Sequence, residues 1–251
     1  MERLEREGKV LDIKKTPSPN RYNGRNGWKP DMICNHITQG RMPGCLSWLR
    51  NPASQASANF LIARNGTIYE LVDIRDAAWC NGTTPQPNKR YYNGRSLLST
   101  VRERNTNANY YTVSIEHEGM SGEPLTEEQY QSSLWLHKHI TIEVKTLYDV
   151  DILVDREHIV GHYQIAPKEK PICPGDAFPW DRLMRDLARW KKERNKGGND
   201  VQTVKVLYKG KRISLRGYVK DGRNYVQIRE AFEKTGHTVD WDNTTKTVII
   251  K

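Results

Sequence analysis

Two histidines and one cysteine stand out among the side chains that could carry chemistry. His36 interrupts a short apolar segment and His162 ends another, where an imidazole is costly unless it has a partner. Cys173 follows His162 by eleven residues, in a loop that three prolines make stiff. Zinc accepts imidazole nitrogen and thiolate sulfur, and three protein ligands leave a fourth position for water. The set is consistent with a catalytic zinc site, and the spacing alone is also compatible with two core histidines and an inert cysteine.

Two carboxylates and two lysines could assist such a site. Glu116 and Glu118 end an apolar segment, and in a strand their side chains would point to one face. A carboxylate there can act as general base toward a metal-bound water, whereas we expect one of the pair to face solvent. Lys168 and Lys170 precede Cys173, and a lysine beside a metal can stabilise the oxyanion formed on an amide carbonyl. We expect at least one of these lysines to be an ordinary solvated residue.

Short apolar runs predict the strands that carry these residues. Apolar or alternating runs of this length are typical of buried strands, and an Asn-Gly pair between two such runs is typical of a tight hairpin turn. Because strand and helix patterns interleave, we predict an α/β fold with a central mixed sheet flanked by helices. The predicted strands are 33–38, 110–119 and 158–162, and the predicted hairpin covers 60–72 with its turn at Asn65-Gly66.

Helix signals and a change in composition predict the domain boundaries. Thr126, followed three residues later by glutamine, forms a capping-box pattern at the start of a long helix. Another helix is predicted over 180–190, and the polar segment 191–201 with its glycine pair reads as a linker. The sequence therefore predicts a catalytic domain over 1–190 and a second, small α+β domain over 202–251.

Charge and hydropathy limit the class of protein. The 251 residues carry a formal net charge of +10 with a mean hydropathy of −0.80. No apolar run reaches the roughly 18 residues of a membrane span, so we expect no membrane partner. Residues 191–251 hold 15 lysines and arginines against 7 acidic residues, which favours an anionic partner or serves solubility alone. No nucleic-acid-binding motif accompanies this charge, and we expect no nucleic-acid partner.

The N-terminal residues and the cysteines bear on where the protein acts. Residues 1–10 are charged and lack the apolar core of a secretory signal. We therefore expect a protein made in the cytoplasm that reaches any external substrate after release. Cys34, Cys45, Cys80 and Cys173 include no CxxC pair, so free thiols or a metal ligand are favoured over disulfides.

Five motifs occur together in the order typical of one enzyme family. Through them, residues 33–180 resemble the type 2 N-acetylmuramoyl-L-alanine amidases, which include phage endolysins, bacterial autolysins and peptidoglycan recognition proteins. Each motif is short, and their common order is what makes the resemblance specific. The segments are NHIT at 35–38, SANFLIARNGTIYELV at 57–72, AAWCNG at 77–82, YTVSIEHEG at 111–119 and HIVGHYQIAPKEKPICPG at 158–175.

This resemblance implies a metal site and a reaction. It implies Zn²⁺ held by His36, His162 and Cys173. It also implies that Glu116 is the general base or the group that orients the water, and that Lys170 stabilises the oxyanion. The implied reaction is hydrolysis of the peptidoglycan amide bond between the lactyl group of N-acetylmuramic acid and L-alanine.

Two positions depart from the family pattern. The family's lysine usually stands eight residues after the second histidine and two before the last ligand. Lys170 is eight residues after His162 but three before Cys173, and we choose it over Lys168. Many relatives carry a histidine where this chain has Cys80, and that histidine is not a zinc ligand.

The C-terminal residues resemble, more weakly, a second family. Residues 225–251 are similar to the small domain named after the N-terminus of copper amine oxidases, and they contain no copper-binding cluster. The basic excess of residues 191–251 agrees with binding an anionic cell wall.

Together these features predict a peptidoglycan hydrolase. We expect a zinc-dependent N-acetylmuramoyl-L-alanine amidase that acts as a phage endolysin on Gram-positive cell walls and reaches them through a holin pore. The alternative is a non-catalytic peptidoglycan-binding protein on the same fold. Such proteins typically lack the cysteine ligand that Cys173 supplies here.

Overall fold

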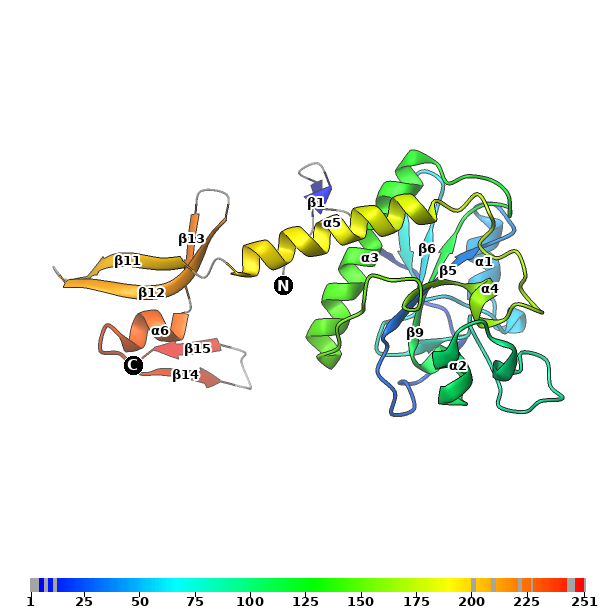
Figure 1. Cartoon of the computed structure of the whole chain (residues 1–251), viewed down its shortest axis with the longest axis horizontal. Coiled ribbons are helices and arrows are strands. Elements are labelled where there is room, and N and C mark those ends of the chain that lie inside the picture. The colour runs from blue at the N-terminus through cyan, green and yellow to red at the C-terminus, as the bar shows by residue number, and fades with distance from the viewer. Residues whose placement is uncertain are drawn as a thin grey trace. The chain divides into compact units, whose positions relative to one another are not determined.

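The computed structural model divides into two compact units, residues 1–187 and residues 188–251. It describes residues 5–6, 9–10, 13–199, 202–208, 211–220, 223–226, 228–242 and 247–250 (Figure 1). All the residues for which we predicted a chemical role lie in the first unit.

A six-stranded mixed sheet forms the centre of the first unit (Figure 1). Its strands are β3 (Ile13–Lys15), β5 (Met32–Ile37), β6 (Phe60–Ile62), β7 (Ile68–Glu70), β9 (Thr112–His117) and β10 (Ile159–Gly161). They lie in the order β10-β5-β9-β6-β7-β3. The β6–β7 pair is antiparallel and the other four pairs are parallel. The predicted α/β fold with a central mixed sheet is confirmed.

The predicted hairpin forms between β6 and β7. Its turn is closed by a hydrogen bond from the Ala63 amide to the Thr67 carbonyl. Gly66 has a φ of +82°, a conformation that favours glycine. A Cβ atom at Gly66 would lie 2.9 Å from the Glu128 carbonyl oxygen, so glycine also allows the hairpin to approach the neighbouring helix.

That helix, α3 (Glu127–Tyr148), begins at the predicted residue but with half of the predicted capping box. The Thr126 hydroxyl accepts a hydrogen bond from the Gln129 amide at 3.1 Å. The Gln129 side chain donates instead to the carbonyls of Ile62 and Glu118, both at 3.0 Å. The helix start is thereby fastened to β6 and to the residue after β9.

Alternation along β5 and β9 divides their side chains between two faces. On one face, Ile33 and Ile115 pack in an apolar cluster with Leu136 and Ile140 of α3. On the other face, Met32 and Cys34 pack in a second cluster, against the side that carries α2 (Ser99–Arg104) and α4 (His162–Ile165). His36 and Glu116 follow the alternation onto this second face. The remaining members of that cluster are Leu98, Val101, Ala108, Tyr111, Val160 and Ile165.

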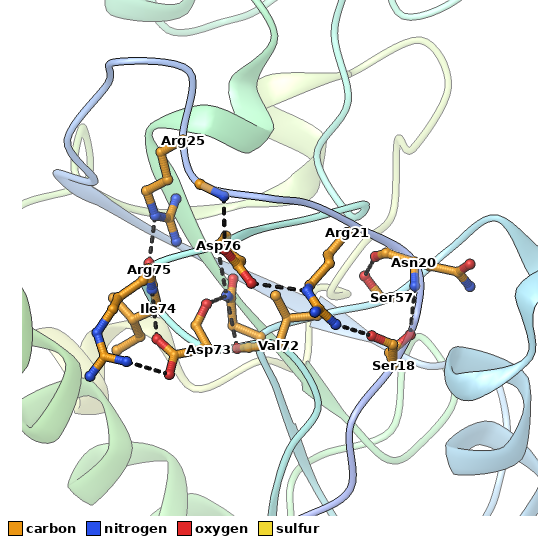
Figure 2. Close-up of polar contacts among 12 residues, drawn as sticks. Ser18, Asn20, Arg21, Arg25, Ser57, Val72, Asp73, Ile74, Arg75 and Asp76 are labelled. Carbon is orange, nitrogen blue, oxygen red and sulfur yellow. Dashed lines mark hydrogen bonds and ion pairs between the residues drawn. The ribbon is translucent and has the colours of Figure 1, made fainter.

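The segment before β5 is fastened to the segment after β7 by polar contacts (Figure 2). Arg21 pairs with Asp76 at 2.9 Å, and Arg25 donates to the Ile74 carbonyl at 2.6 Å. Arg25 is buried, and burial lowers its pKa to about 10. A short pair of strands, β4 (Arg21–Tyr22) and β8 (Ala77–Ala78), completes the attachment and fixes where the chain enters residues 79–82.

Short elements complete the described part of the first unit. They are β1 (Glu5–Arg6), β2 (Lys9–Val10), α1 (Gly44–Arg50) and the 3-10 turns η1 (Pro52–Ser54), η2 (Asn93–Arg95) and η3 (Ala108–Tyr110). Across all the described residues, no helix combines the length and apolar character that a membrane crossing requires.

Helix α5 (Trp180–Asn199) extends beyond its predicted end. We predicted that the helix would stop at Trp190 and that a linker would cover 191–201, but residues 191–199 are helical. Lysine, arginine and glutamate fill most of this segment and favour helix, and the glycine pair comes only at its end. The division between the two compact units falls inside this helix, after Leu187.

The second unit is α+β in its described residues, as predicted. Strands β11 and β12 pair antiparallel, as do β12 with β13 and β14 with β15. Their bounds are β11 (Gln202–Tyr208), β12 (Lys211–Lys220), β13 (Arg223–Val226), α6 (Ile228–Glu233), β14 (Val239–Asp242) and β15 (Thr247–Ile250).

Candidate metal centre

Parallel strand pairing brings His36 and His162 to the same edge of the sheet. His36 is the fifth residue of β5, and His162 follows β10 directly as the first residue of α4. Gly161 pairs with Asn35, so His162 and His36, the residues that follow them, lie side by side. The loop that carries Cys173 is fastened to α4 by a hydrogen bond from the Tyr163 amide to the Cys173 carbonyl at 2.9 Å. One nitrogen or sulfur atom from each of the three residues lies within 4.8 Å of the other two.

The contacts inside this group are close. The Cys173 sulfur lies 3.8 Å from His36 Nδ1. The rings of His36 and His162 meet edge to face, with centroids 4.5 Å apart. The Nε2 atom of His162 is buried and has no hydrogen-bond partner among the described residues. A buried nitrogen of this kind is costly unless something completes its bonding.

Burial sets the protonation of the three side chains. It lowers the pKa of His36 to about 3 and that of His162 well below its ordinary value. Both imidazoles are therefore neutral at pH 7, the form that binds metal ions. Burial also raises the pKa of the Cys173 thiol to about 12, so a thiolate here needs a cation beside it. Two imidazole nitrogens and one sulfur are a donor set that suits zinc.

Glu116 lies directly across from His36, on the neighbouring parallel strand. Its Oε2 atom is buried and has no hydrogen-bond partner within the described part of the chain. Burial raises the pKa of Glu116 to about 7, and the nearby charge of Lys170 partly opposes this rise. A carboxyl group with a pKa near neutrality can both take up and release a proton at pH 7.

Glu118 has a different role from the one we expected. We predicted that one of the two glutamates would face solvent, but Glu118 is only 7% exposed and Glu116 lines the cleft described below. The Glu118 carboxylate accepts hydrogen bonds from the Met42 amide at 3.0 Å and the Arg64 amide at 2.8 Å. It therefore holds the loop after β5 against the β6–β7 hairpin.

The two candidate lysines differ in placement. Lys170 lines the cleft together with Glu116, His162 and Cys173. Its positive charge acts to lower the pKa of both Glu116 and Cys173. Among the described residues that line this cleft, Lys168 does not appear. The geometry therefore favours Lys170 as the cation beside the candidate site.

Cys80 lies at the centre of the site, although it is 44 residues from His36 in the sequence. Its sulfur is 3.4 Å from His36 Nε2 and 3.9 Å from Glu116 Oε1. The amides of Cys80 and Asn81 both donate to the Asn109 side chain, at 3.2 Å and 2.6 Å. These contacts hold the loop against η3, and the Asn81 side chain donates to the hydroxyls of Thr112 and Ser114 in β9 at 2.7 Å and 3.0 Å. The side chains of His36, Cys80 and Glu116 form a second group with metal-ligand atoms in reach of one another.

The site opens into a cleft of about 540 Å³. Past Cys80 and Lys170 it adjoins a second depression of about 580 Å³. Arg41, Trp48 and Trp79 line the first cleft, and none of them was predicted from the sequence. Arg41 and Trp48 follow His36 within twelve residues, and this closeness in the chain was the signal that could have found them.

Two parts of the chain match known families. Residues 26–176 match the family described as N-acetylmuramoyl-L-alanine amidase. Residues 207–251 match the family described as copper amine oxidase N-terminal domain. The first match covers more than half of the chain and includes every candidate site residue.

Individual relatives support the first match. The 1,6-anhydro-N-acetylmuramyl-L-alanine amidase AmpD of Haemophilus influenzae is 32% identical over 133 residues, which are 53% of this chain and 59% of that protein. N-acetylmuramoyl-L-alanine amidase A of Achromobacter lyticus is 27% identical over 158 residues, 58% of this chain and 76% of that protein. The crystal structure of a selenomethionine AmpD derivative shares the fold, with a TM-score of 0.50 and 22% identity over 73% of this chain and 98% of that one.

Proposed function

This chain belongs to the N-acetylmuramoyl-L-alanine amidase family, and on that premise we propose that it is a zinc-dependent amidase acting on peptidoglycan. The bond cleaved is the amide between N-acetylmuramic acid and L-alanine. The matched segment spans about three-fifths of the length of the Haemophilus relative. The activity is therefore proposed from the site residues of this chain and is not transferred from that protein.

The convergence of His36, His162 and Cys173 is the observation that carries the proposal. Their ligand atoms lie within 4.8 Å of one another beside a cleft, and both imidazoles are neutral at pH 7. These three residues would hold Zn²⁺ and leave a fourth position open. When bound there, the ion would polarise the scissile carbonyl and make its water a stronger acid.

The other side chains supply proton transfer and charge. Glu116, whose pKa is raised to about 7, accepts the proton of the attacking water and then delivers it to the departing L-alanine amine. Lys170 provides a positive charge in the same cleft for the oxygen anion that develops on the carbonyl. Arg41 and Trp48 line the cleft and supply surface for the rest of the substrate.

The test is cleavage of purified Gram-positive cell walls by the full chain. We expect new L-alanine amino termini to appear, cleavage to stop when a chelator is added, and zinc to restore it. The Cys173→Ser variant should lose both bound zinc and cleavage. Unchanged cleavage in the chelator and in Cys173→Ser would refute the zinc assignment. Binding to walls without any cleavage would instead favour a non-catalytic peptidoglycan-binding protein.

The names of the relatives favour a second candidate substrate. Relatives such as the Haemophilus protein are named 1,6-anhydro-N-acetylmuramyl-L-alanine amidases, which suggests a soluble muropeptide in place of the polymer. The second unit and its basic charge favour the polymer. Parallel assays with intact walls and with a 1,6-anhydromuropeptide separate the two, because a muropeptide enzyme would leave intact walls uncut.

We also propose that the protein is a phage endolysin, because it joins an amidase unit to a small basic unit. It would then act on a Gram-positive wall after release through a holin pore. Expression in a Gram-positive host with and without an inducible pore protein tests this. Lysis should follow only when the pore opens, and lysis without the pore would contradict the proposal.

A further inference from the structure

The two ring nitrogens of His36 lie beside different sulfur atoms. Nδ1 lies 3.8 Å from the Cys173 sulfur, within the group proposed to hold zinc. Nε2 lies 3.4 Å from the Cys80 sulfur. His36 is only 2% exposed, so bulk water does not serve as a partner for this second nitrogen.

A histidine that binds a metal through one nitrogen carries its proton on the other. That N–H normally donates to a neighbouring group, which fixes the ring orientation and the tautomer. With the ion on Nδ1 of His36, Nε2 becomes the donor. The Cys80 sulfur lies 3.4 Å from this nitrogen, and the Asn81 side chain, whose Oδ1 has no other partner within the described residues, is also in hydrogen-bonding reach of the His36 ring. The loop of residues 79–82 that carries both side chains is held against η3 by the Asn109 side chain.

We propose that Cys80 is a positioning residue that accepts the Nε2–H of His36 and thereby fixes the metal-binding tautomer of that ligand. The proposal rests on the zinc-amidase function proposed above. It assigns Cys80 a role outside the metal's own ligand set, although its sulfur lies within reach of His36 and Glu116.

The same thiol also connects the ligand to the proposed general base. The Cys80 sulfur is 3.9 Å from Glu116 Oε1, so its S–H can donate to the carboxylate while its lone pairs accept from His36. A single side chain thus contacts both of the groups that face one another across β5 and β9. Because a thiol is a weak acceptor, removing it should reduce metal affinity by an amount at the lower end of the range known for groups that hydrogen-bond metal-binding histidines.

The test compares the full-length wild type with Cys80→Ala and Cys80→Ser, and uses Cys34→Ala as the matched control. Cys34 is a buried thiol on the same face of β5, two residues from His36, and it packs in the apolar cluster. Zinc affinity is measured by competition with a chelating dye. The tautomer of His36 is read from nitrogen-15 NMR of the imidazole in the zinc-loaded protein, and the visible spectrum of the cobalt-loaded protein counts thiolate ligands.

We expect the wild type to show His36 bound through Nδ1 with its proton on Nε2. Cys80→Ala should weaken zinc binding about tenfold and disturb the Nε2–H signal. Cys80→Ser should recover most of the affinity, and Cys34→Ala should leave affinity and tautomer unchanged. The thiolate-to-cobalt absorption should be the same in wild type and Cys80→Ala, because Cys173 alone supplies the thiolate.

Three results would overturn the inference. The first is zinc bound through Nε2 of His36. The second is an unchanged affinity and tautomer in Cys80→Ala, which would assign the acceptor role to the side-chain oxygen of Asn81. The third is a loss of thiolate-to-cobalt absorption in that variant, which would make Cys80 itself a ligand. A wild type that binds no zinc at all would refute the proposed function as well, so the two failures are distinguishable.

Discussion

His36 and Glu116 are register partners on the adjacent parallel strands β5 and β9. This pairing fixes the distance between a proposed metal ligand and the proposed general base through the backbone of the sheet. Glu116→Gln keeps the size of the side chain and removes its ability to take a proton. We expect zinc content to be unchanged and wall cleavage to fall by about 10²- to 10⁴-fold. Full activity in Glu116→Gln would assign proton transfer to another group.

Lys170 and Lys168 provide a matched pair in one loop. Lys170 lines the cleft and Lys168 is not among the described residues that do so. Lys170→Met should lower kcat by roughly 10²-fold with little change in KM, because its charge is needed only as the oxyanion develops. Lys168→Met should cut walls at the wild-type rate. Equal losses in the two variants would indicate a general effect of charge on wall binding.

Glu118 should matter for stability. Its carboxylate accepts hydrogen bonds from the partly buried amides of Met42 and Arg64. Glu118→Ala leaves both donors without a partner, and we expect the free energy of unfolding to fall by about 3 kcal/mol. Glu128→Ala, which removes an exposed acid in the first turn of α3, should change it much less. Urea unfolding measures both, and equal stability of the two variants would contradict this role.

His137 should make the first unit sensitive to acid. The ring is fully buried. Its Nε2 lies 3.2 Å from the Asn35 side-chain nitrogen, and its Nδ1 lies 2.8 Å from the Ser133 carbonyl oxygen. His117, which would carry the same charge if protonated, is close enough to interact with it electrostatically. Burial lowers the pKa of His137 to about 4, against about 6.5 in the unfolded chain. The unfolded state therefore binds more protons below pH 6.5, and the native state loses stability as the pH falls through that value.

The size of this loss can be measured by difference. Between pH 7.5 and pH 5 the His137 contribution should fall by about 2 kcal/mol. His137→Gln has no titrating ring at this position. Its free energy of unfolding in urea should therefore fall by about 2 kcal/mol less than that of the wild type between pH 7.5 and pH 5. Identical pH dependence in the two proteins would show that His137 is not the group responsible.

The second unit should increase attachment to cell walls. Residues 191–251 carry the basic excess, and α5 is helical to Asn199, so the truncation should end at residue 199 to keep the helix whole. We expect the full chain to pellet with walls more completely than residues 1–199, and we expect this difference to shrink as salt is added. Equal pelleting at low salt would refute a wall-binding role for the second unit.

The strands that carry the site could be predicted because their sequence pattern is local. The runs around His36 and Glu116 are short and apolar, and the Asn-Gly turn that precedes β7 specifies its own geometry. The end of α5 could not be predicted in the same way. A glycine pair normally suggests a linker, but the lysines and glutamate before it favour helix strongly enough to carry the helix on to Asn199.

The position of Cys80 depends on contacts that no local pattern reveals. Its loop is set by the Asn109 side chain and by the pairing of β8 with β4, both far away in the sequence. The burial of Glu118 also depends on distant contacts. Its two donors come from separate loops, so its burial appears only once the hairpin and the loop after β5 meet.

The pairing of β10 with β5 has a consequence for the order of folding. Val160 pairs with Cys34, so the chain between them must close a loop of 126 residues before His162 can meet His36. Contacts this distant in sequence are slow to form and tend to come late. A partly folded chain therefore lacks the complete ligand group, and a metal ion that binds only the finished sheet pulls the whole unit toward its native state by mass action. If the proposed zinc site is filled in this way, zinc supply during synthesis would govern how much folded protein accumulates, and metal binding should lag behind the appearance of secondary structure.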